Sequence, residues 1–101
     1  MAELVERINT MITSESRDLA QIERTLTDGY AAALTLEAER WRIERRIAEV
    51  AQGLKKGDTT NQARELASLS ERLDGNKGRL TSLRAVLADL RRHMDRVRTH
   101  R

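Results

Sequence analysis

The sequence predicts an all-α protein, an antiparallel two-helix coiled-coil hairpin, and three observations lead to this fold class. The 101 residues include no Pro and only 5 Gly, which argues against a turn-rich β-fold. Apolar residues recur at alternating spacings of three and four, the heptad pattern of coiled coils. One short polar segment around Gly57 divides this pattern into two halves. We therefore expect a single helical hairpin over residues 1–101.

The first helix is expected over residues 3–55, because one apolar seam runs through this range. The seam occupies heptad positions a and d, and its apolar members are Val5, Ile8, Ile12, Leu19, Ile22, Leu26, Ala33, Leu36, Ile43, Ile47, Val50 and Leu54. Glu15, Gly29 and Arg40 interrupt it. A glycine inside a helix costs about 1 kcal/mol relative to alanine, so Gly29 could end this helix early. Because the heptad phase continues past Gly29 without a slip, we expect the helix to continue as well.

A short loop is expected at residues 56–59. Lys55 and Lys56 suit the negative end of a helix, and Gly57 suits the left-handed conformation that often follows one. Thr59 and Gln62 have the spacing of a capping box at the start of the next helix. Because the loop is so short, the two helices that it joins are expected to run antiparallel.

The second helix is expected over residues 60–99. The apolar members of its seam are Leu66, Leu69, Leu73, Leu80, Leu83, Leu87, Leu90, Met94 and Val97. Asn76 interrupts the seam, and Gly75 and Gly78 lie close to it. A break at these glycines would give a bundle of shorter helices, but the heptad phase again runs through without a slip. We expect a continuous helix that is softest near Gly75.

Folding the chain at this loop fixes a register for the facing layers. Gly29 then faces Leu87, so that a missing side chain leaves room for a large one. Arg40 faces Asn76 in the same register. Two polar residues that share a layer lose less than a polar residue facing leucine, because each can form hydrogen bonds or retain water. We interpret Arg40 and Asn76 as a device that fixes the register, and a simple solvated layer is the alternative.

In this register the paired part of the first helix ends near Glu15, so residues 2–14 extend beyond it. Val5, Ile8 and Ile12 form an apolar stripe on the extension, with no expected partner within the chain. An amphipathic helix of this kind is suited to packing against another helix. Val5, Ile8 and Ile12 are therefore candidate partner-binding residues, and fraying of the terminus is the alternative.

A second apolar surface lies outside the seam, on the flank of the first helix. Tyr30, Leu34 and Trp41 occupy positions e and b, beside small residues such as Ala31 and Ala38. Aromatic side chains are enriched at interface hot spots, and a two-helix hairpin has only a thin core. We expect Tyr30, Leu34 and Trp41 to bind a second copy, pairing two hairpins into a four-helix assembly, or another helical protein. The alternative is that Trp41 only covers the stems of arginines.

The sequence offers no catalytic constellation. It has no Cys, so thiolate chemistry and disulfides are excluded. His93 and His100 are the only histidines, and no carboxylate cluster near them completes a metal site. The sequence therefore predicts no enzyme activity, no cofactor and no metal. The expected function is that of a noncatalytic interaction protein: a scaffold, an adaptor or a small helical chaperone.

The C-terminal part of the second helix supports an alternative function. The net charge of the chain is +3, and arginines dominate this part. Arg84, Arg91, Arg92 and Arg98 could contact nucleic-acid phosphates without reading sequence. Nonspecific nucleic-acid binding is therefore the alternative to protein interaction. No apolar run is long enough for a membrane span, so we expect no membrane partner and, with no Cys, a cytoplasmic location.

Overall fold

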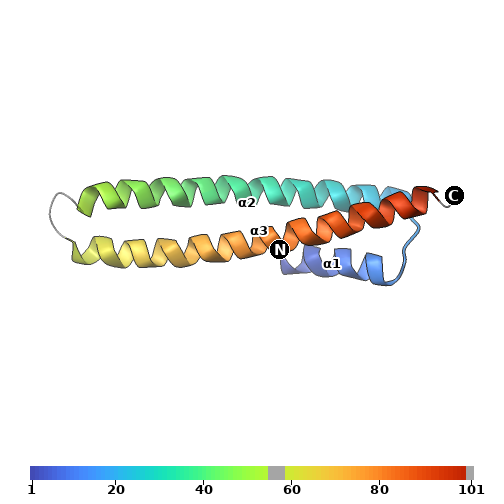
Figure 1. Ribbon diagram of the computed structural model, residues 1–101, viewed down its shortest axis with the longest axis horizontal. Coiled ribbons are helices and arrows are strands. Elements are labelled where there is room, and N and C mark those ends of the chain that lie inside the picture. The colour runs from blue at the N-terminus through green and yellow to red at the C-terminus, as the bar shows by residue number, and fades with distance from the viewer. Residues whose placement is uncertain (55–58, 100–101) are drawn as a thin grey trace.

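The computed structural model describes residues 1–54 and 59–99 and forms three helices. They are α1 (Ala2–Thr13), α2 (Leu19–Leu54) and α3 (Thr60–Thr99), and the described residues contain no strand (Figure 1). The all-α class is thus confirmed. The molecule is an elongated rod with extents of 66 × 17 × 15 Å. Residues 55–58 lie outside the described part of the chain, and so does most of the loop expected at 56–59; Thr59 precedes α3 and is not helical.

α2 and α3 pack together and lie antiparallel (Figure 1). At one end the Arg46 Nε donates to the Glu65 carboxylate at 2.7 Å, and at the other an Arg98 Nη donates to the Glu23 carboxylate at 2.7 Å. The hydrogen bond to Glu65, followed by that to Glu49, raises the pKa of the Arg46 guanidinium above its ordinary value. All of these side chains are substantially exposed, so solvent screens each pair and its contribution to stability is small.

The apolar seam between α2 and α3 has the predicted register at its glycine. A Cβ built on Gly29 would overlap the buried side chain of Leu87. Both helices continue through their glycines, because Gly29 lies within α2 and Gly75 and Gly78 lie within α3. The heptad phase, rather than the glycine content, therefore predicts where these two helices continue.

The polar layer has a different arrangement from the one expected. Asn76 is fully buried, and its Nδ2 donates a hydrogen bond to the backbone carbonyl of Leu36 at 2.9 Å. The Arg40 side chain instead forms an ion pair with Glu44 on its own helix, at 3.3 Å. Asn76 thus joins α3 to α2 through the backbone. The role of Arg40 and Asn76 in fixing the register stays a prediction.

The single helix expected over residues 3–55 is wrong, because the chain turns at residues 14–18 between α1 and α2. The turn closes α1 in a Schellman motif: the Glu15 N–H donates to the Ile12 carbonyl at 3.1 Å, and the Ser16 N–H donates to the Met11 carbonyl at 3.0 Å. Glu15 has the left-handed φ of 53° that this motif requires. Glycine usually holds that position, so the sequence lacks the ordinary signal for the end of a helix.

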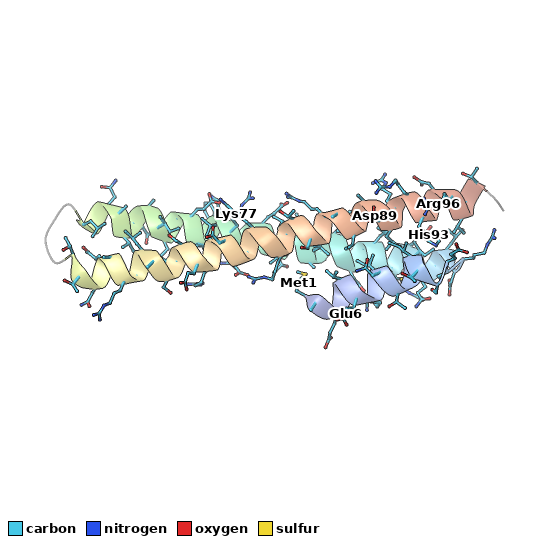
Figure 2. The ribbon with its side chains drawn as sticks, turned by 60° about the horizontal axis from the view of Figure 1, so that its bottom comes forward. Met1, Glu6, Lys77, Asp89, His93 and Arg96 are labelled. Atoms are coloured by element: carbon cyan, nitrogen blue, oxygen red, sulfur yellow. The ribbon has the colours of Figure 1, made fainter. Side chains whose placement is uncertain are left out.

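Two further contacts hold this turn. Asp18 caps the start of α2, because its Oδ1 accepts a hydrogen bond from the Gln21 N–H at 3.1 Å. On α3, the Nε2 of His93 lies 2.6 Å from the Ser16 carbonyl oxygen and donates to it. His93 is buried on the side of α3 that faces the turn (Figure 2). His93, which the sequence does not assign to a metal site, therefore links the turn to α3.

α1 folds back along the other two helices and packs chiefly on α3 (Figure 1). Ile8 is completely buried and Met11 nearly so, while Val5 and Ile12 are partly buried against the same core. Arg7 forms an ion pair with Asp28 of α2 at 3.1 Å. The extension expected at residues 2–14 is thus wrong: the apolar stripe does have a partner within the chain.

Glycine at position 15 is expected to stabilise the protein by about 1 kcal/mol. A residue with a Cβ is strained at the left-handed φ of Glu15, and glycine removes that strain. Chemical denaturation of the Glu15→Gly variant measures the gain. Glu15→Ala, which keeps a Cβ at the same φ, is the matched control and should not show it.

Candidate functional site

α1 covers one side of the α2–α3 pair and leaves the outer face of α2 open. We define this outer face by four residues on adjoining heptad positions, Ala31, Leu34, Ala38 and Trp41, all of which are exposed. Leu34 is 67% exposed and Trp41 is 62% exposed. Large apolar side chains this exposed are the feature of the described surface that most needs an explanation.

Two arginines hold the aromatic rings of this region without covering them. The Arg45 guanidinium lies 5.4 Å from the centre of the Trp41 ring, in cation–π contact. Arg91 of α3 donates a hydrogen bond of 3.5 Å to the Tyr30 hydroxyl. Tyr30 is still 43% exposed. The rings are therefore oriented by polar neighbours while their apolar surface stays in contact with solvent.

A shallow groove of about 490 Å³ adjoins the outer face, between α2 and α3. Its apolar lining comes from Tyr30, Ala33, Leu34, Leu87 and Ala88, with charged side chains at the margins. The groove and the outer face share Leu34 and form one continuous apolar surface. This surface lacks the enclosure of a small-molecule pocket and has the form of a surface onto which another helix packs.

The structure separates the six predicted partner-binding residues into two groups. Tyr30, Leu34 and Trp41 lie together on the exposed flank of α2. Val5, Ile8 and Ile12 instead belong to the core beneath α1, so they are not available on the surface of this form. While α1 stays folded back in this way, its apolar face cannot also bind another protein.

The arginines predicted to bind nucleic acid are mostly engaged with acidic side chains. Arg84 forms an ion pair with Glu37 of α2, and Arg92 forms one with Asp89 of α3. Arg98 is paired with Glu23, as described above, and Arg91 contacts the Tyr30 hydroxyl. Pairing with carboxylates lowers the positive potential that phosphate binding depends on. The arginine-rich end of α3 is consequently a weaker nucleic-acid site than its composition suggests.

The described residues hold no group of three or more His, Cys, Asp or Glu side chains close enough together to bind a metal ion. Within the same part of the chain, no helix is both long and apolar enough to cross a membrane. Comparison of the chain with protein-family models, with curated proteins and with solved structures finds no match.

Proposed function

We propose that this chain is a noncatalytic coiled-coil interaction protein that associates with a second copy through the outer face of α2. The two α2 helices then lie side by side at the centre of a four-helix assembly, each with its own α3 on the far side. The observation that carries the proposal is the exposure of Leu34 and Trp41 beside two exposed alanines. Burying such side chains on a partner contributes favourable free energy in proportion to the apolar area removed from water.

The order of large and small residues on the outer face favours a second copy as the occupant. When two α2 helices pair antiparallel about a two-fold axis near residue 36, Trp41 of each copy meets Ala31 of the other. Leu34 of each copy likewise meets Ala38 of the other. Each large side chain thus faces a small one, which allows the two helices to approach closely. An isologous contact requires this kind of self-complementarity.

Sedimentation equilibrium at micromolar concentrations tests the proposal. The unmodified chain is expected to dimerise, and Trp41→Ala is expected to weaken the dimer about 1,000-fold, because truncating a hot-spot tryptophan costs about 2 kcal/mol or more and each dimer loses two of them. The emission of the single tryptophan should also shift to shorter wavelength when the dimer forms, because dimerisation removes Trp41 from water.

Ala85→Glu provides a matched control, because Ala85 is exposed on α3 away from the outer face. It should leave the dimer unchanged, whereas Leu34→Glu should disrupt it. Circular dichroism would show that each variant keeps its helix content. A chain that stays monomeric at every concentration would contradict self-association. Salt-sensitive DNA binding lost in an Arg91→Glu, Arg92→Glu variant would then favour the nucleic-acid alternative.

A further inference from the structure

We propose that α1 is an exchangeable arm: when the turn at residues 14–18 straightens, α1 of one copy occupies the α1 site of a second copy. The resulting dimer joins two molecules end to end and does not use the outer face of α2. The site that α1 enters is the groove that it already fills in its own chain, so the contacts of Ile8 and Met11 are the same in both forms. An exchange that preserves its contacts is a low-cost route to a dimer.

The heptad pattern supports the straight form of the hinge. Val5, Ile8 and Ile12 continue in phase into Leu19 and Ile22 across the turn. A single helix through residues 14–18 therefore keeps all of these side chains on one stripe. Glu15 is the only polar residue at the seam positions between Ile12 and Leu19. The sequence is thus compatible both with the turn and with an uninterrupted helix.

The turn itself is under strain in the folded-back form. Glu15 has a φ of 53°, in the left-handed region that L-residues with a Cβ rarely adopt. Straightening the turn gives Glu15 ordinary helical dihedrals but removes the Asp18 cap and the contact between His93 and Ser16. The folded-back and straight forms therefore each have stabilising features that the other lacks. A strained hinge of this kind favours exchange between copies.

The direction of α1 meets the geometric requirement for exchange. Met1 and Val5 lie near Gly78 of α3, whereas Ile12 lies near Val97, so α1 runs parallel to α3 (Figure 2). Straightening carries α1 past the end of its own molecule. A second copy, placed end to end by a two-fold axis across the rod, presents its α1 site there. The incoming α1 then runs from the interior of that copy toward its end, which is the direction of the α1 that it replaces.

Crosslinking between two single-cysteine chains tests the exchange, because the natural chain has no Cys. One chain carries Arg7→Cys and the other Asp28→Cys, positions that form an exposed ion pair between α1 and α2. Both also carry Leu34→Glu, which removes pairing through the outer face. The two chains are unfolded, mixed, refolded and treated with a short bis-maleimide. Exchange predicts a crosslinked pair of unlike chains, which neither chain forms with itself.

Two substitutions at Glu15 are expected to change the affinity of the exchanged dimer in opposite directions. Glu15→Leu, which places an apolar residue in the seam, should tighten the exchanged dimer at least tenfold. Glu15→Gly, which removes the strain of the turn, should weaken it at least tenfold. The same crosslink yield in both variants, or no crosslink of unlike chains at any concentration in the chain with Glu15, would overturn the exchange. If the Glu15→Leu chain does not fold, the crosslink yield of the Glu15→Gly chain is compared with that of the chain with Glu15. Equal yields would again overturn the exchange.

Discussion

Replacing Ile8 with alanine is expected to destabilise the protein by about 3 kcal/mol, the usual loss for a large aliphatic side chain truncated in a core. Ile8 is completely buried, and it packs in the same core as Leu83 and Leu90, which are also completely buried. Removing its side chain therefore leaves a cavity at the junction of all three helices. The midpoint and slope of urea denaturation measure the loss.

Thr10→Ala is the matched control for this prediction, because Thr10 lies on the exposed side of α1. It should change stability by no more than about 0.5 kcal/mol. The comparison also separates two arrangements of residues 2–13. A terminal helix that extends beyond the paired helices would tolerate Ile8→Ala almost as well as Thr10→Ala. Equal stabilities of the two variants would therefore contradict the packing of α1 on α3.

Gly29→Leu is expected to destabilise the protein by about 2 kcal/mol. The better helix propensity of leucine contributes about 1 kcal/mol in the opposite direction, but overpacking a core costs more than that. A Cβ at position 29 already overlaps Leu87, and a whole leucine side chain would have to displace it. Thermal or urea denaturation of the variant gives the net change.

Two further variants show that the loss comes from contact with Leu87. Gly29→Leu combined with Leu87→Ala should cost less than the sum of the two single changes, because each large side chain then faces a small one. Gly78→Ala should instead stabilise the protein by about 1 kcal/mol, since no atom lies within 4 Å of the Cβ that it adds. Losses from both glycine substitutions would point to a general intolerance of side chains in these helices rather than to Leu87.

The pairing of α2 with α3 could be predicted because it depends on a repeated pattern. Every heptad places apolar residues on the same face of the helix, so one weak position such as Gly29 or Asn76 does not change which faces of α2 and α3 pack together. The contact of Gly29 with Leu87 follows directly from that pattern. The outer face was equally accessible to sequence analysis, since Leu34 and Trp41 occupy positions that cannot reach the seam.

The turn after α1 could not be predicted in the same way. The heptad phase of Val5 and Ile8 is the same whether α1 continues α2 or folds back, so periodicity carries no information on the choice. Glu15 in place of glycine hides the end of α1. The available signals were local: Glu15 interrupts the seam, and Asp18 has the side chain of a helix cap. Because the sequence does not reveal this turn, it assigns Val5, Ile8 and Ile12 to an interface with another protein, although they lie in the core.

The unequal thickness of the rod has a consequence for its mechanics. Near the α1 end, three helices share one core, whereas at the opposite end the core is narrower and centres on Ile43, Val50 and Leu69. Fewer apolar contacts hold α2 and α3 together at the narrow end, so thermal fluctuations will separate the two helices there first. The rod is thus stiffer at its α1 end than at its opposite end. A force that pulls α2 and α3 apart at the narrow end would separate them progressively toward α1.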